Sequence, residues 1–177
     1  EVIDAALRAG AHMVNDVRAL RLPGALEAAA RHDAAVCVMH MQGEPGTMQA
    51  DPRYEDVVAE VRQFLRARIE ACLAAGIGAD SICVDPGIGF GKTAQHNLEL
   101  LRHLDAFTVL GVPLLLGVSR KSLVGIITGR PAADRMVGSA AFAALGVERG
   151  ARIVRAHDVA ATVDAVRVAA ALIQGLD

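Results

Sequence analysis

Short, continuous runs of apolar residues alternate along this chain with longer segments of amphipathic character. The apolar runs cover residues 12–14, 34–39, 81–84, 113–118 and 152–154. They are too short for independent helices and most are rich in Val, Leu or Ile, so each predicts a β-strand buried on both faces. Strands of this kind are typical of a parallel sheet whose strands are joined by helices.

Helical periodicity fills the segments between the predicted strands. It is strongest over residues 55–75, where hydrophobic residues recur every three or four positions and Gly76 follows as a helix-ending residue. Further helices are predicted at residues 1–9, at 24–31, after the loop 87–91 with Leu98, Leu101 and Leu104 on one face, around Met136 to Val147, and at 159–174. A strand followed by a helix is therefore repeated five times.

Two architectures are compatible with five such repeats, a doubly wound sheet and a (β/α)8 barrel. A doubly wound sheet concentrates its site at one switch point. A barrel collects site residues from the carboxyl ends of many strands, and here all five predicted strands end in polar residues. We therefore predict a TIM barrel. Five strands cannot close one, and the chain begins within a helical pattern, so we expect a single domain over residues 1–177 that is a barrel fragment lacking about three upstream strands.

Composition narrows the functional classes. Hydrophobic residues make up 53% of the chain and the formal net charge is −2, which gives no electrostatic reason to expect nucleic acid or an anionic membrane surface as a partner. The apolar runs are far shorter than a membrane span. The chain has three cysteines, Cys37, Cys72 and Cys83. None forms a CxxC motif, and all fall within strand-like or helical patterns. We interpret them as reduced core thiols of a cytoplasmic protein.

The predicted strand ends carry side chains suited to binding a ligand. Asp85, directly after a buried strand, can accept two N–H donors from a planar heterocycle, and this role is favoured over a simple turn carboxylate. Asn15 beside Asp16 offers an amide that can read both donors and acceptors on a ring edge, although an Asn-Asp pair is more often a turn. His40 could add an imidazole or be purely structural.

Cations gather after the last two strands. Residues 119–122, Ser-Arg-Lys-Ser, place two cations where a helix begins, a setting for an anion or a π-rich ligand. Residues 155–158, Arg-Ala-His-Asp, place Arg155 and His157 at the final strand, where barrels often bind phosphate, and alternation puts both side chains on one face. The chain lacks an HxH pair, so a protein-bound zinc site is disfavoured.

The segment 87–93, Gly-Ile-Gly-Phe-Gly-Lys-Thr, does not fit a phosphate-binding loop. It has neither the Walker A spacing nor a GxGxxG match. Its functional interpretation is a loop whose backbone approaches a ligand, with Phe90 as an apolar wall. A plain turn remains an equal alternative.

Taken together, these segments resemble dihydropteroate synthase along essentially the whole chain. The resemblance rests on five motifs in family order: Asn-Asp-Val-Arg at 15–18, Met-His-Met-Gln-Gly at 39–43, Asp-Pro-Gly-Ile-Gly-Phe-Gly-Lys at 85–92, Ser-Arg-Lys-Ser at 119–122 and Arg-Ala-His-Asp at 155–158. The family usually has Val where Ala156 stands, which leaves the Arg and the His in place.

The resemblance implies a transferase of folate biosynthesis that is the target of sulfonamides. It would join p-aminobenzoate to 6-hydroxymethyl-7,8-dihydropterin diphosphate, giving 7,8-dihydropteroate and diphosphate. By position, Asn15, Asp85 and Lys121 would bind the pterin ring, and Met39, Phe90 and Gly117 would line its pocket. Arg155 would stack on the pterin and hold the diphosphate with His157, while Lys121 and Ser122 would border the p-aminobenzoate site. The implied catalytic residues are Lys121, Arg155 and His157.

The resemblance also implies parts that this chain lacks. The family's Mg²⁺ is held by an Asn on the first barrel strand, so we expect no metal ligand within this chain. We expect the 177 residues alone to be inactive and poorly stable, and the full-length protein to be a homodimer. Two alternatives remain: a pterin-binding methyltransferase domain, against which Lys121 and the Arg155/His157 pair count, and a non-catalytic remnant of a broken gene.

Overall fold

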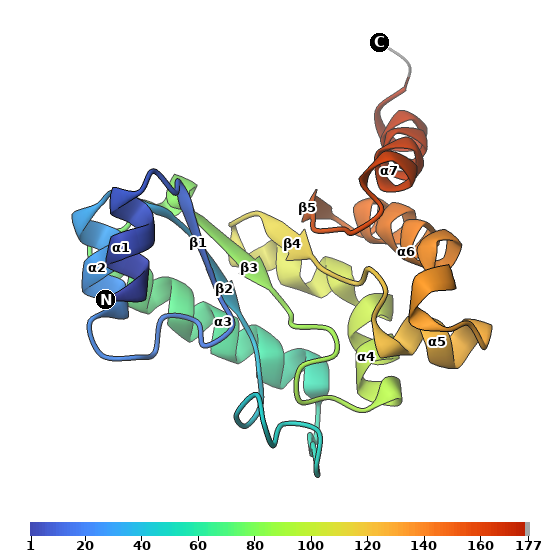
Figure 1. The fold of residues 1–177 in the computed structure, drawn as a ribbon, viewed down its shortest axis with the longest axis horizontal. Helices are drawn as coiled ribbons and strands as arrows, with labels where there is room; N and C mark the ends of the chain where they lie inside the picture. The colour runs from blue at the N-terminus through green and yellow to red at the C-terminus, as the bar shows by residue number, and fades with distance from the viewer. Residues whose placement is uncertain (176–177) are drawn as a thin grey trace.

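The computed structural model describes residues 1–175 and contains one parallel sheet with helices packed around it (Figure 1). The strands are β1 (Met13–Asp16), β2 (Ala35–Met39), β3 (Ile82–Asp85), β4 (Leu114–Leu116) and β5 (Ala151–Val154). The helices are α1 (Val2–Arg8), α2 (Ala25–Arg31), α3 (Val57–Ala74), α4 (Ala94–Arg102), α5 (Ser122–Thr128), α6 (Met136–Glu148) and α7 (Val159–Gln174). Three 3₁₀ helices span Ala79–Ser81, Leu104–Leu110 and Ala132–Asp134.

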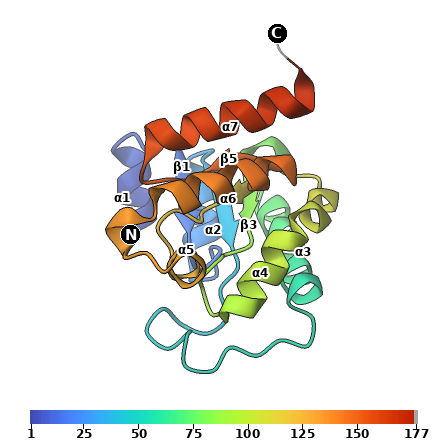
Figure 2. The same cartoon turned by 90° about the vertical axis from the view of Figure 1, so that its right-hand side faces the viewer.

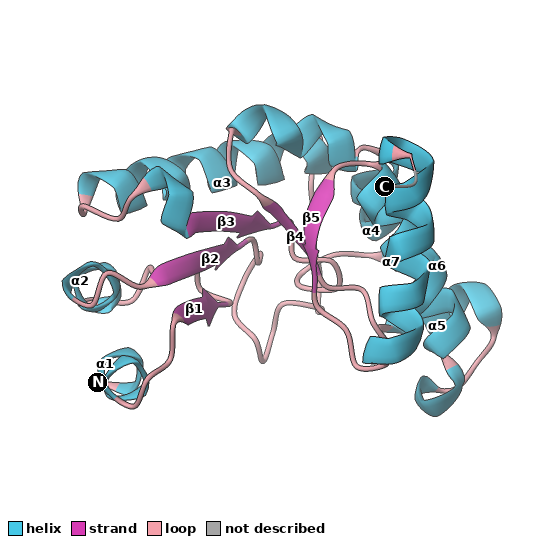
Figure 3. Ribbon diagram, turned by 90° about the horizontal axis from the view of Figure 1, so that it is seen from above, coloured by secondary structure: helices cyan, strands magenta, loops and turns pink. Residues whose placement is uncertain are grey.

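The strand order decides between the two predicted architectures. The five strands follow one another in sequence order, β1-β2-β3-β4-β5, and all four pairings are parallel. A doubly wound sheet would reverse its order at a switch point, whereas a barrel adds each strand beside the last. Viewed from above, the strands form an arc with the helices on its outer side (Figure 3). The barrel prediction is confirmed: the arc is an incomplete, open barrel built from five β-α units.

The two faces of the sheet are filled differently. On β2, Val36 and Val38 point outward into the main core, where they meet buried side chains of α3 such as Leu65. The alternate residues point to the inner face, where Cys37 and Cys83 lie side by side in register and form a small cluster with Leu115 and Ile153. Two residues further along the strands, on the same face, Met39 and Asp85 are paired and fully buried. The inner face therefore changes from apolar to polar toward the carboxyl ends of the strands.

Side-chain caps start two of the helices, α3 at Asp56 and α4 at Thr93. The Asp56 carboxylate accepts hydrogen bonds from the amides of Val58 and Ala59 at 3.0 and 2.9 Å, which starts α3 at Val57, two residues inside the predicted range. The prediction placed Leu104 on the same helix as Leu98, which was wrong. His103 leaves the helical conformation, so α4 ends at Arg102 and Leu104 begins a separate 3₁₀ helix. Helices α6 and α7 pack against each other (Figure 2).

Two predictions made from composition, on the cysteines and on the apolar segments, can be compared with the structure. All three cysteines are buried and unpaired, as predicted for core thiols. No helix among residues 1–175 combines the length and the apolarity needed to cross a bilayer.

Candidate functional site

A buried carboxylate lies at the centre of the polar strand ends. Asp85, the last residue of β3, has a fully buried side chain. Its Oδ1 accepts a hydrogen bond from the Gly87 amide at 2.8 Å, and its Oδ2 accepts one from Arg155 Nη2 at 3.1 Å. Arg155 follows β5, so this ion pair passes over β4, where Gly117 leaves room for it. A methyl group on Gly117 would come within 2.4 Å of the Arg155 guanidinium.

Lys121 approaches the same carboxylate from the loop after β4. Its ammonium donates a hydrogen bond to the Ile88 carbonyl and lies 4.6 Å from the centre of the Phe90 ring. Burial lowers the pKa of Lys121 to about 8, an effect that Asp85 opposes and Arg155 reinforces. Because Lys121 loses its proton near neutral pH, a bound anion or a π-rich ring beside it would stabilise its charged form.

Lys92 is the last residue of the motif at 85–92, but the sequence indicated no role for it. The structure shows that it is buried at the base of the loop 87–91. Its side chain is buried, and its ammonium lies 2.9 Å from His40 Nδ1. It also donates to the carbonyls of Gly87 and Phe90 at 3.0 and 2.9 Å, and to the His40 carbonyl at 3.4 Å. Burial lowers the pKa of Lys92 to about 7, and burial beside Lys92 lowers the pKa of His40 to about 3.

The loop 87–91 is bound by two lysine side chains. The ammonium of Lys92 donates to the Gly87 and Phe90 carbonyls, and that of Lys121 donates to the Ile88 carbonyl. Two of its glycines have positive φ and no room for a side chain, since a Cβ on Gly87 would meet the His40 carbonyl at 1.8 Å and one on Gly91 the Gln42 carbonyl at 2.4 Å. Neighbouring groups therefore fix the loop backbone, and the prediction that this backbone approaches a ligand with Phe90 as a wall stays a prediction.

A polar hollow of about 160 Å³ opens between the loops after β4 and β5. Its lining residues are Gly117, Ser119, Lys121, Arg155, Ala156 and His157. The prediction that Arg155 and His157 share a strand face was wrong in detail, because β5 ends at Val154 and both residues follow it. They nevertheless line the same hollow.

Ser119 fixes the imidazole at one wall of this hollow. The Ser119 hydroxyl accepts a hydrogen bond from the His157 amide at 3.0 Å and lies 3.0 Å from His157 Nδ1. A nucleophilic serine would need a third group orienting the histidine, but the neighbouring Asp158 carboxylate is bound by both arms of Arg120. The contact therefore orients His157 rather than activating Ser119.

The remaining predicted site residues surround this centre at different depths. Met39 is buried beside Asp85 on the inner face, and Ser122 is exposed as the first residue of α5. Asn15 is exposed within β1, one strand beyond Met39, in register with Cys37. It therefore lies on the same face as Asp85 but nearer the apolar level of the sheet.

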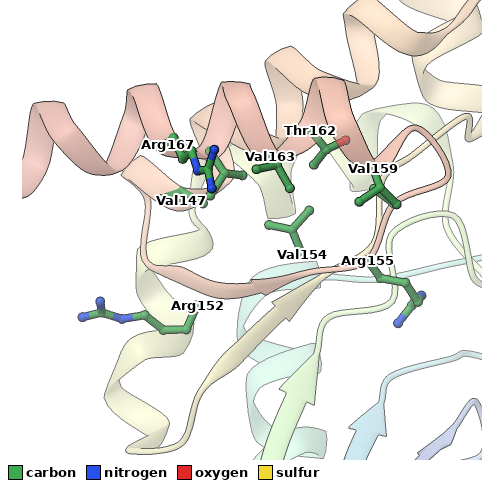
Figure 4. Close-up of a pocket in the computed structure, with 10 residues that line it drawn as sticks. Val147, Arg152, Val154, Arg155, Val159, Thr162, Val163 and Arg167 are labelled. Carbon is green, nitrogen blue, oxygen red and sulfur yellow. The ribbon is translucent and has the colours of Figure 1, made fainter.

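A separate hollow of about 490 Å³ lies between β5 and α7 (Figure 4). Val154, Val159 and Val163 point into it, whereas the guanidinium of Arg155 points away. This hollow is mainly apolar and outside the polar strand ends. Within residues 1–175 no three His, Cys, Asp or Glu side chains are grouped so as to hold a metal ion.

The arrangement favours a flat, nitrogen-rich ligand that carries an anionic group. The Asp85 carboxylate can accept adjacent N–H donors of a ring, Phe90 and Met39 offer apolar contact, and Lys121, Arg155 and His157 supply positive charge or donors for the anion.

Comparison with known proteins agrees with this chemistry. Residues 1–157 match the family described as pterin binding enzyme. The chain is 48% identical over 167 residues to dihydropteroate synthase from Haemophilus influenzae, which covers 94% of this chain and 61% of the relative. It superposes with a TM-score of 0.96 and 45% identity on the Yersinia pestis dihydropteroate synthase solved as a sulfonamide drug complex, covering 99% of this chain and 64% of that one.

A second solved structure is dihydropteroate synthase from Xanthomonas albilineans in complex with 7,8-dihydropteroate. Its TM-score is 0.90 at 48% identity, covering 98% of this chain and 63% of that one. The chain thus spans about three fifths of the length of the relatives it matches.

Proposed function

Because this chain belongs to the pterin-binding enzyme family, we propose that it forms the pterin-binding domain of a dihydropteroate synthase, a transferase of folate biosynthesis. The observation that carries this proposal is the buried Asp85 carboxylate, with Arg155 bound to it and Lys121 beside it at the carboxyl end of a barrel sheet. The relatives named dihydropteroate synthase, one of them complexed with 7,8-dihydropteroate, support the same reaction.

The pterin ring would lie over the polar end of the inner face. Asp85 accepts the ring's adjacent N–H donors, and Asn15 and Lys121 complete the contacts with its edge. Met39, Phe90 and Gly117 form the walls. Gly117 matters because its missing side chain leaves room for the Arg155 guanidinium beside it. A planar cation in that position can stack on the ring as well as bind an anion.

The diphosphate would occupy the hollow between Arg155 and His157. In the reaction, the bond between the pterin methylene carbon and the diphosphate oxygen breaks, and its electron pair leaves with the diphosphate. The amine nitrogen of p-aminobenzoate attacks the methylene carbon and then loses a proton. Arg155, His157 and Lys121 stabilise the negative charge that develops on the leaving oxygen, so they are the proposed catalytic residues. No covalent bond to the protein is required.

The second substrate, p-aminobenzoate, would enter beside α5. Lys121 and Ser122 border that position, with Ser122 exposed at the helix start. The Yersinia relative was solved as a sulfonamide drug complex, which supports the further proposal that this protein is a sulfonamide target.

Mg²⁺ is the proposed metal accompanying the diphosphate. The described residues bring no three metal-ligating side chains together, so they do not fit a metal site by themselves and the protein ligand is proposed to lie outside them.

Four further proposals complete this assignment. The protein is cytoplasmic and works as a homodimer when full length. Residues 1–177 form a single domain. On their own they are poorly stable and inactive, because within the described residues β1 and β5 each have one strand edge without a partner.

The reaction is tested by incubating the intact gene product with p-aminobenzoate and the pterin diphosphate and measuring pteroate formation by chromatography. Asp85→Asn serves as the matched inactive control. Binding of pterin without pteroate formation would contradict the synthase proposal. If methyl transfer to a corrinoid were then observed, the methyltransferase alternative would replace it, and failure to bind any pterin would indicate the remnant.

A further inference from the structure

We propose that the ion pair between Arg120 and Asp158 fixes the position of the two cationic sides of the site relative to each other. One side is Lys121, which follows Arg120 in the loop after β4. The other is the pair Arg155 and His157, which precedes Asp158 in the loop after β5. This inference rests on the proposed function, because it concerns where the diphosphate is held.

The pair is bidentate and joins residues 38 positions apart. Arg120 Nε donates to Asp158 Oδ2 at 3.0 Å, and Arg120 Nη2 donates to Oδ1 at 2.5 Å. Two parallel hydrogen bonds fix both the distance and the angle between the planar groups. Asp158 precedes α7, but its carboxylate caps no amide of that helix, so both oxygens remain available to Arg120.

A second tie runs beside the first. Ser119 contacts His157 through its hydroxyl, and the adjacent Arg120 contacts the adjacent Asp158. Two consecutive residues of one loop are thus bound to two consecutive residues of the other. This double tie prevents the loops from rotating relative to each other, which a single contact would permit.

The backbone of Arg120 is held as firmly as its side chain. Its φ of 58° lies in the left-handed region, which costs an L-residue about 1 kcal/mol. Its amide donates to the Ser139 hydroxyl at 3.0 Å, and its carbonyl accepts from Arg135 Nη1 at 3.1 Å. Arg135 Nη1 also reaches the Lys121 carbonyl at 3.3 Å. A strained residue persists where its surroundings determine it in this way, and here it directly precedes Lys121, whose ammonium reaches the Ile88 carbonyl.

The test compares two ligands in the intact gene product, 6-hydroxymethyl-7,8-dihydropterin and its diphosphate, each titrated by pterin fluorescence. The first reports the ring contacts alone, and the ratio of the two affinities reports the diphosphate site. Two variants break the tie: Asp158→Asn removes one charge, and Arg120→Gly removes the guanidinium while tolerating the left-handed backbone. Each is expected to lower the affinity ratio about tenfold and leave binding of the alcohol within about twofold.

The double variant Arg120→Asp with Asp158→Arg reverses the pair and places a residue tolerant of positive φ at position 120. It is expected to recover most of the lost ratio. An unchanged ratio in both single variants would overturn the inference, as would equal loss of both ligands or no recovery in the reversed pair. If the wild-type protein bound neither ligand, the proposed function itself would fail, which is a separate result.

Discussion

Arg155 reaches across β4 to the buried carboxylate of Asp85, and the two groups meet at 3.1 Å. The carboxylate is inaccessible to solvent, whereas two fifths of the Arg155 side chain is exposed. A ligand can therefore move Arg155 aside or lie against it, but it cannot bind Asp85 without entering the inner face of the sheet. This asymmetry makes Asp85 the fixed element of the site and Arg155 the adaptable one.

Replacing Asp85 by Asn should weaken pterin binding about 50-fold, because a charge-assisted hydrogen bond to the ring is lost. The amide oxygen can still accept from the Gly87 amide, so the loop should keep its conformation. Titration of pterin fluorescence measures the effect. Asp164→Asn, which alters an exposed carboxylate on α7, is the control and should bind as the wild type does. Equal affinities of Asp85→Asn and the control would show that the ring binds elsewhere.

Gly117→Ala should separate binding from stability. The added methyl would overlap the guanidinium of Arg155, which is the far end of a flexible side chain and can move. We expect affinity for the pterin diphosphate to fall about tenfold while the free energy of unfolding changes by less than about 1 kcal/mol. Gly78→Ala is the matched control, since a methyl there meets no atom within 4 Å. A large loss of stability in Gly117→Ala would mean that the backbone, not Arg155, absorbs the overlap.

The rate of the proposed reaction should fall as pH rises through about 8. The pKa of Lys121 is lowered to about 8 by burial, so the ammonium proposed to stabilise the leaving diphosphate is lost above that pH. A profile of kcat/KM against pH measures this. Lys121→Arg keeps its charge throughout the range, so whatever activity it retains should not decline there. A decline of the same shape in both proteins would assign the titration to another group.

Lys92→Met should destabilise the protein by about 2–4 kcal/mol, because three buried carbonyls lose a donor. Urea unfolding measures the loss, and Arg66→Met on the exposed side of α3 is the control. A loss no larger than that of the control would show that the loop does not depend on Lys92.

The same lysine predicts a pH dependence of stability. Its pKa is lowered to about 7 in the folded state, so between pH 7 and its ordinary value of 10.5 the unfolded chain binds more protons. The free energy of unfolding should therefore rise with pH across that window, and the contribution should disappear in Lys92→Met. His40, whose pKa is lowered to about 3, gives the same sign between pH 3 and 6.5.

The sequence predicted the strands well because each combines continuous hydrophobicity with a polar end. Asp85 illustrates this, since a carboxylate directly after the buried run 81–84 has few places to lie other than the strand end. The barrel followed from the spread of such residues over five strands. The sequence could not show which loops contact each other. In the sequence, Arg120 and Asp158 look like ordinary surface residues. Their ion pair forms because β4 and β5 are neighbours in the sheet and place the following loops side by side.

Lys92 shows the same limit for burial. A lysine after a glycine-rich loop is normally solvated, and nothing within the motif indicates otherwise. Its acceptors come partly from its own loop and partly from His40, 52 positions earlier in the chain. The one available signal is composition: Lys92 and Lys121 are the only two lysines in a chain with sixteen arginines, and both contact the loop 87–91.

That scarcity of lysine has a practical consequence for handling the protein. Within these 177 residues, reagents and activated surfaces that capture side-chain amines find them only beside the loop 87–91, and Lys121 is the more exposed of the two. A sample of this chain immobilised through its lysine side chains would be attached at the proposed ligand site and would report no binding even if fully folded. Attachment through an added terminal tag leaves that face open to the solution.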